Sequence, residues 1–258
     1  IQGILVVTVI WYSTYWICKK LKLDDEFAAL LSSAVSICGV SAAIATSGAI
    51  KGDPKKLSYT TSLVLICAVP MLVLQPLIAK WIGIPDEVAA AWLVATIDNN
   101  GSDVEAGALL RDRAMKVGVI VNMSQNVLIG VAAFILAVVW TYKRAEEVPG
   151  GEKPGIMEIW IRFPKFVLGF MAVSILFSFI LSPAAVAASK GLLGGIRTMW
   201  FALAFMSIGL ETNFREISTM GGGKPALGFL AGQGLNIIWT LILAYLIFGG
   251  YIFAVPKF

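Results

Sequence analysis

Apolar runs separated by short polar segments dominate the chain. A run of about 20 apolar residues is long enough to cross a bilayer as a helix. Runs of this kind occupy residues 1–17, 27–50, 59–82, 115–142, 156–181 and 225–248. Two further runs, 88–97 and 196–210, are too short for a hydrocarbon core of about 30 Å at about 1.5 Å per residue. We therefore predict an all-α, polytopic membrane protein in which the short runs are broken or re-entrant helices.

Small residues and glycines interrupt the run 27–50, which distinguishes it from the other long runs. Gly39 lies near its middle, where glycine permits a helix to unwind and another helix to approach closely. A bend at Cys38, Gly39 and Ser41 would expose backbone N–H groups, and half-helix termini in transporters bind anions in this way. These three residues are therefore candidate substrate ligands.

The chain also shows a weak internal repetition of an interrupted helix, a basic loop and a long apolar helix. The order occurs over residues 27–82 and again over 196–248. Transporters with inverted repeats show such symmetry, although glycine-bearing helices are common in membranes for other reasons. We predict one transmembrane transporter domain over residues 1–258, in which 27–82 ends a first repeat and 86–258 holds a second.

A polar stretch follows the short run 88–97, where a helix should still be crossing the membrane. An ionisable residue at a helix centre costs roughly 2.5–3.5 kcal/mol to insert and marks function by default. Asp98 and Asp103 are therefore candidate ligands for a coupling ion. Neighbouring polar side chains are candidate substrate ligands: Asn99, Asn100 and Ser102. The alternative is a surface turn, which the Asn-Asn-Gly composition suits well.

Glu211 is a third candidate for ion coupling. It follows the short run 196–210, at a position that would be a helix C-terminus. The helix dipole disfavours a carboxylate there, so the residue indicates a cation, a proton or a basic partner nearby.

Amide side chains recur at helical spacing inside two of the long runs. Asn122, Gln125 and Asn126 stand at i, i+3 and i+4 and would share one face of a helix. Gln233 and Asn236 stand three apart in the last run. A buried polar group without a partner costs roughly 2–7 kcal/mol, so these amides should face protein, water or a ligand. They are candidate substrate ligands, and the alternative is that they hydrogen-bond neighbouring helices.

Composition supports a membrane protein and argues against several other classes. The 258 residues are 58% hydrophobic and 14% charged, against about 45–50% apolar and 25% charged in soluble domains. The sequence has no histidine, which argues against haem or zinc chemistry. Its three cysteines are widely spaced and suit buried apolar positions. With no nucleophile elbow or phosphate loop, we expect neither an enzyme nor a cofactor, and the modest net charge of +4 indicates no nucleic-acid partner.

Four segments carry a resemblance to a known family. They are SICGVSAAIA at 36–45, TIDNNGSDVEAGALL at 96–110, KVGVIVNMSQNVLIG at 116–130 and WFALAFMSIGLETN at 200–213. On these motifs the sequence resembles the YeiH-type family of bacterial membrane proteins, which are assigned as sulfate exporters. The resemblance covers the chain from about residue 27 to its end.

That family is similar to the superfamily of cation:proton antiporters and bile-acid symporters. The resemblance implies inverted repeats of about five helices, with 27–50 and 196–210 as the crossing pair and roughly two helices before residue 1. Many relatives carry Ser-Ile-His-Asp where this chain has Thr96-Ile97-Asp98-Asn99. A proton-coupling role for that histidine therefore does not transfer to this chain.

The leading hypothesis is a secondary transporter that moves a small anion, such as sulfate or an organic sulfonate, by alternating access with Na⁺ or H⁺ as the coupling ion. One alternative is a cation/proton antiporter without an anion substrate. Another is a non-catalytic, ion-conducting subunit of a membrane enzyme. We expect a multi-pass protein of the bacterial inner membrane, surrounded by lipid, for which a homodimer suits the architecture.

Overall fold

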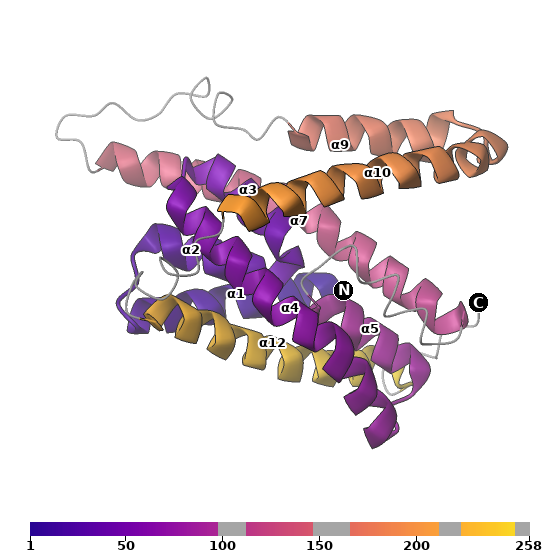
Figure 1. Ribbon diagram of the computed structural model, residues 1–258, viewed down its shortest axis with the longest axis horizontal. Coiled ribbons are helices and arrows are strands. Elements are labelled where there is room, and N and C mark those ends of the chain that lie inside the picture. Colours follow the sequence, from indigo (N-terminus) through magenta and orange to yellow (C-terminus); the bar gives the residue numbers. More distant parts are fainter. Residues whose placement is uncertain (98–111, 147–165, 212–222, 251–258) are drawn as a thin grey trace.

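The computed structural model describes residues 1–97, 112–146, 166–211 and 223–250, and regular structure in these ranges is entirely helical (Figure 1). The elements are α1 (Gln2–Lys20), α2 (Asp25–Ser33), η1 (Ala34–Cys38), α3 (Val40–Ile50), α4 (Pro54–Ile82), α5 (Asp86–Thr96), α7 (Asp112–Glu146), α9 (Phe166–Ile175), η2 (Leu176–Ile180), α10 (Pro183–Glu211) and α12 (Lys224–Phe248). Within these ranges, the helical segments Pro54–Ile82, Ile120–Lys143 and Lys224–Phe248 are long and apolar enough to cross a membrane. The all-α prediction is confirmed.

The run 27–50 forms two α-helices separated by a π-helical turn. Asp24 caps α2 by accepting a hydrogen bond from the Phe27 N–H at 2.9 Å. The π-helical η1 ends at Gly39, whose backbone angles are φ +67° and ψ −116°. Side chains with a Cβ are sterically excluded from that region, so glycine allows α3 to start at the next residue. The interruption lies at the predicted glycine, and its membership of a crossing pair stays a prediction.

One predicted boundary is wrong. The short run 196–210 was predicted to be a broken or re-entrant helix, but it is part of α10, which is continuous from Pro183 to Glu211. The residues before 196 are helical because they are rich in alanine, the strongest helix former, and because Ser182 begins the helix, with its Oγ 3.4 Å from the Ala185 nitrogen. By contrast, the short run 88–97 does form a short helix, α5.

α1 and α12 pack closely through glycines on α12. A Cβ placed on Gly232 would lie 2.6 Å from Thr14 Oγ1 and 2.7 Å from Thr14 Cγ2, and one on Gly228 would lie 3.0 Å from Cys18 Sγ. Phe229, which lies between the two glycines, is fully buried. Small residues of this kind allow helix backbones to approach in membranes, where dispersion contacts hold helices together.

We predict that Gly232→Ala destabilises the protein by about 1–3 kcal/mol, because Thr14 is β-branched and cannot rotate away easily. Thr14→Ala should restore most of the loss, since it removes the two closest atoms. The measurement is the unfolding midpoint of the detergent-solubilised protein during SDS titration. Gly234→Ala is the control, because its Cβ would meet nothing within 4 Å. Equal midpoints for the two alanine variants would contradict the close contact.

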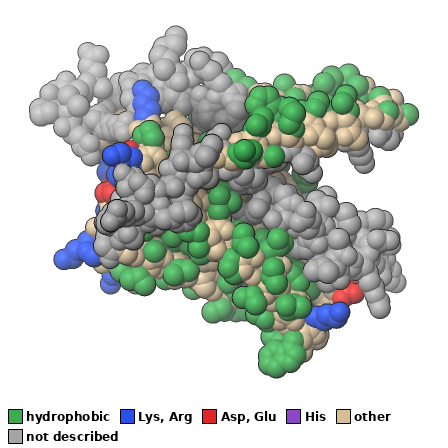
Figure 2. Space-filling view, viewed as in Figure 1, with side chains coloured by type: hydrophobic (Ala, Val, Ile, Leu, Met, Phe, Trp, Pro, Cys, Tyr) green, Lys and Arg blue, Asp and Glu red, His purple; other side chains and the backbone are tan. Residues whose placement is uncertain are grey.

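The surface has an apolar middle and charged ends. Figure 2 shows hydrophobic side chains over much of the described face, with Lys and Asp or Glu gathered towards the left and at the lower right. On α4, Val69, Val73 and Leu77 are each more than half exposed. Such a surface is expected of helices that lie in lipid, because apolar side chains there need no burial in protein.

Candidate functional site

The π-helical turn η1 lies at the centre of the described helices. It contacts α1, α4, α5, α7 and α12 as well as its two neighbours in sequence. Its Val35 carbonyl accepts a hydrogen bond from Asn236 Nδ2 at 2.9 Å, and Asn236 Oδ1 accepts one from Thr240 Oγ1 at 2.9 Å. Both ends of the Asn236 amide are therefore used in joining α12 to η1 and in an intrahelical bond.

A second set of hydrogen bonds joins α12 to the end of α5. Gln233 Nε2 donates to the Thr96 carbonyl at 2.7 Å, and Thr96 Oγ1 lies 3.1 Å from Gln75 Nε2 on α4. Gln233 Oε1 is buried and has no hydrogen-bond partner among the described residues. Thr96 and Ile97 are themselves buried, so α5 ends inside the protein.

The amide face predicted on α7 is present. Gln125 is 2% exposed, and Asn122 and Asn126 are half-buried on the same side of the helix. Asn126 Nδ2 donates a hydrogen bond to Asn122 Oδ1, so these two amides contact each other one turn apart on α7. Within the described ranges, Gln125 Nε2 and Asn126 Oδ1 are buried without a hydrogen-bond partner.

Two further polar side chains, which the sequence did not indicate as candidates, are buried in the interior. Gln2 on α1 is 5% exposed and Ser36 on η1 is 1% exposed. Neither amide atom of Gln2, nor Ser36 Oγ, has a hydrogen-bond partner in the described part of the chain. A Cβ on Gly3 would lie 3.4 Å from Gln125 Cγ, so the start of α1 packs directly on Gln125. A lone glutamine at the start of an apolar run is the signal that could have identified Gln2 from the sequence.

The interruption at Gly39 lies beside these groups. Val7, Ile37, Cys38 and Ala42 form one buried cluster, on which Leu128, Ile129 and Ala132 pack. Gln125 lies one helical turn before Leu128 on α7, and α7 contacts both η1 and α3. The first N–H groups of α3, among them that of the half-buried Ser41, have no acceptor within the helix.

We call Gln2, Ser36, Gln125 and Asn126 the polar layer. Buried polar atoms without partners are few in native proteins, and each costs about 1–3 kcal/mol. Four such side chains around one interrupted helix, beside the positive end of a helix dipole, form an environment that can bind a polar or anionic ligand. The arrangement offers amide and hydroxyl groups that both donate and accept hydrogen bonds.

The stretch 98–103 and Glu211 hold the remaining candidates. Asp98, Asn99, Asn100, Ser102 and Asp103 lie outside the described residues. Glu211 is the last residue of α10, and only its backbone is described. The predicted roles of these residues in substrate or ion binding therefore stay predictions.

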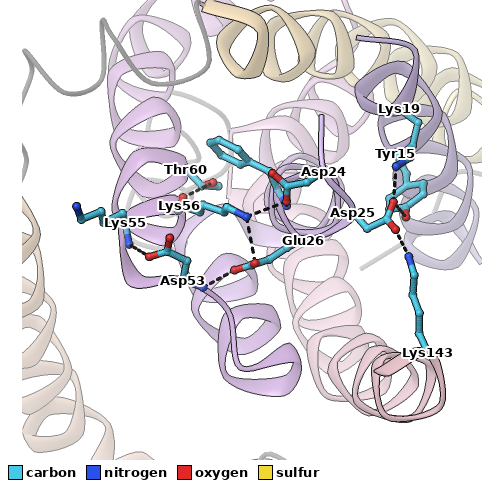
Figure 3. Close-up of polar contacts among 11 residues, drawn as sticks. Tyr15, Lys19, Asp24, Asp25, Glu26, Asp53, Lys55, Lys56, Thr60 and Lys143 are labelled. Atoms are coloured by element: carbon cyan, nitrogen blue, oxygen red, sulfur yellow. Dashed lines mark hydrogen bonds and ion pairs between the residues drawn. The ribbon is translucent and has the colours of Figure 1, made fainter. Parts of the chain in front are cut away.

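Charged side chains hold the start of α2, at the opposite end of that helix from η1 (Figure 3). Lys56 at the start of α4 lies 2.9 Å from Asp24 Oδ1 and 3.1 Å from Glu26 Oε2. Burial alone would raise the pKa of Asp24, but hydrogen bonds from Lys56 and the Phe27 N–H, together with the lysine charge, outweigh burial and lower it. These contacts fix α2 against α4 at the end where both helices begin.

The chain matches the family described as Conserved hypothetical protein 698 over residues 1–228. UPF0324 membrane protein RB9488 of Rhodopirellula baltica is 44% identical over 255 residues, covering 95% of this chain and 46% of the relative. A UPF0324 membrane protein of Nitratidesulfovibrio vulgaris is 42% identical over 241 residues, covering 89% of this chain and 41% of the relative.

UPF0324 membrane protein NE0724 of Nitrosomonas europaea is 36% identical over 263 residues, covering 89% of this chain and 53% of the relative. The chain thus spans about half the length of the curated relatives it matches. No solved structure matches it. Its relatives are named as membrane proteins, in agreement with its apolar helices, and the predicted family is confirmed. The chain belongs to the family of Conserved hypothetical protein 698, the YeiH family of membrane proteins.

Proposed function

We propose that the whole protein is a secondary transporter that moves a small anion across the bacterial inner membrane by alternating access. The observation that supports this proposal is the polar layer beside Gly39. Buried polar groups inside an apolar bundle carry a free-energy penalty that a transported ligand can offset when it binds. The proposal includes no catalytic step and no cofactor.

The chemistry of the polar layer favours an anion. The N-terminus of α3 presents backbone N–H groups and a partial positive charge of about half a unit. Gln125 Nε2 on α7 is a further buried donor without a described partner, and Ser36 on η1 supplies a hydroxyl that can also donate. A tetrahedral oxyanion such as sulfate, or an organic sulfonate, accepts several such hydrogen bonds at once.

Coupling would use the carboxylates predicted from the sequence. Asp98 and Asp103 follow α5, whose end at Thr96 and Ile97 is buried, and Glu211 ends α10. In the proposal, one or more of these carboxylates binds Na⁺ or H⁺. Movement of α2, η1 and α3 relative to the surrounding helices would carry the ligand between the two sides of the membrane.

Solid-supported-membrane electrophysiology on proteoliposomes of the full-length protein tests the proposal. Sulfate, sulfite, taurine and chloride would be applied separately, with and without Na⁺ and a pH gradient. A current evoked by one sulfur oxyanion and lost in Asn126→Ala and Asp98→Asn, with folding intact, is the expected result. Normal transport by both variants would contradict the proposed roles of Asn126 and Asp98.

Other outcomes of the same experiment would replace the proposal. Currents that need only a Na⁺ or pH jump would indicate a cation/proton antiporter. Silence towards every jump, together with stoichiometric co-purification of other subunits, would indicate an ion-conducting subunit of a membrane complex.

A further inference from the structure

An apolar groove of about 420 Å³ runs along the outside of the molecule between α1 and α7. Aromatic residues line its α1 side, where Trp11 and Tyr15 stack with ring centroids 5.1 Å apart and Tyr12 is 67% exposed. Val139 and Trp140 line the α7 side. The Trp11 Nε1–H donates to Ser33 Oγ at 3.0 Å, so this indole needs no partner within the groove.

The two helices run in the same direction, so their C-terminal ends lie together at one end of the groove. Near its beginning α1 packs on Gln125, and near its end Tyr15 packs in the same cluster as Trp140. Each helix carries a lysine just beyond the groove, Lys19 on α1 and Lys143 on α7. The end of the groove is therefore basic as well as aromatic.

Both lysines converge on Asp25 (Figure 3). Lys19 Nζ lies 2.5 Å from Asp25 Oδ1, and Lys143 Nζ contacts Asp25 Oδ2. Tyr15, a groove residue, donates its hydroxyl hydrogen to the same carboxylate at 3.0 Å. Two positive charges share one negative charge, which leaves one positive charge in excess. The lysine side chains remain 44% and 42% exposed and can accept a further anion.

Groove and lysines are continuous with each other. Lys143 Nζ lies 5.8 Å from the centroid of the Trp140 ring, which forms part of the groove. Lys20 lies 4.7 Å above Trp16 at the same end of α1. Tryptophan, tyrosine and lysine are the side chains that membrane proteins place at the level of lipid headgroups.

We propose that this groove is a binding site for one anionic phospholipid, whose acyl chain lies along α1 and α7 and whose phosphate is held by Lys19 and Lys143. Charge complementarity favours this occupant. An apolar protein segment could fill the groove but would leave the excess positive charge of the two lysines unpaired. An anionic lipid can place its acyl chain in the groove and its phosphate on the lysines. The site is separate from the polar layer and does not depend on transport.

Native mass spectrometry of the full-length, delipidated protein in detergent tests the site. With added phosphatidylglycerol we expect one tightly retained lipid per protomer, in clear preference to phosphatidylcholine. Lysines near an anionic headgroup contribute roughly fivefold each to affinity, so Lys19→Gln with Lys143→Gln should weaken phosphatidylglycerol binding about 25-fold. Lys143→Arg, which keeps the charge, should bind normally. Lys80→Gln is the control, because Lys80 lies in the last turn of α4, whereas the start of α4 is the end that contacts α2.

Asp25→Asn should change the affinity for phosphatidylglycerol in the opposite direction. It removes the competing carboxylate and frees both lysines, so phosphatidylglycerol should bind about fivefold more tightly. Val139→Trp should fill the groove and abolish retention, whereas Val69→Trp, at an exposed position on α4, should not. Equal retention of the two lipids, weaker binding in Asp25→Asn, or a Val139→Trp variant that keeps its lipid and instead changes its oligomeric state would overturn the proposal.

Discussion

Gly39→Ala should destabilise the protein by about 1–3 kcal/mol and abolish transport. At φ +67° and ψ −116°, a Cβ would clash with the neighbouring backbone, and residues held in such regions cost about that much. Relief of the strain would move the end of η1 and the start of α3. That movement would displace the donors that the proposed site needs. The measurements are the SDS unfolding midpoint and the anion-evoked current in proteoliposomes.

Gly48→Ala in the same helix is the matched control. Gly48 is exposed, has no positive φ, and its Cβ would meet nothing within 4 Å. Alanine there should leave the protein as stable or up to about 1 kcal/mol more stable, because alanine favours a helix over glycine. If Gly39→Ala behaved like Gly48→Ala, the interruption would have no role in stability or transport.

Gln125→Met should lower transport by roughly 10- to 150-fold while leaving stability unchanged or higher. A hydrogen bond to a charged ligand is worth about 1.5–3 kcal/mol, which gives that range of affinity. In the absence of ligand, Gln125 Nε2 is buried without a described partner, so an apolar side chain of similar size removes a penalty. Rising stability with falling activity is the pattern expected of a residue kept for binding. Anion-evoked currents and SDS unfolding measure the two effects.

Gln75→Met separates this role from a structural one. Gln75 is 4% exposed, nearly as buried as Gln125, but its amide is hydrogen-bonded to Thr96. Its replacement should destabilise the protein by about 0.5–1.5 kcal/mol, the net value of a typical hydrogen bond. A Gln125→Met variant that lost stability in the same way would show that Gln125 joins helices and does not bind a ligand.

Local patterns were sufficient for much of the fold. Long apolar runs predicted membrane helices, because a span is set by the thickness of the hydrocarbon core. The spacing of Asn122, Gln125 and Asn126 placed them on one face, since that follows from the pitch of any α-helix. The interruption at Gly39 was predictable because its cause, the missing Cβ, is a property of the residue itself.

Other features depended on residues far apart in the sequence. Asn236 and Gln125 are equally plausible ligands by sequence. In the structure, the Asn236 amide is hydrogen-bonded to the Val35 carbonyl and to Thr240, whereas Gln125 Nε2 has no described partner. Gln2 joins the polar layer because α1 packs on α7. Such differences are long-range, because a hydrogen-bond partner is set by helix packing and not by neighbouring residues.

The sequence by itself determined a helical membrane protein of the YeiH family, its principal apolar helices, and the glycine at which one of them is interrupted. These properties follow from apolar length, helical period and glycine chemistry, which are local. Only the tertiary structure decided which buried amides are satisfied, that 183–211 is one continuous helix, and that Lys19, Asp25 and Lys143 meet beside an apolar groove. Those features arise when packing brings together side chains that are distant in sequence, and the polarity pattern along the chain does not encode them directly.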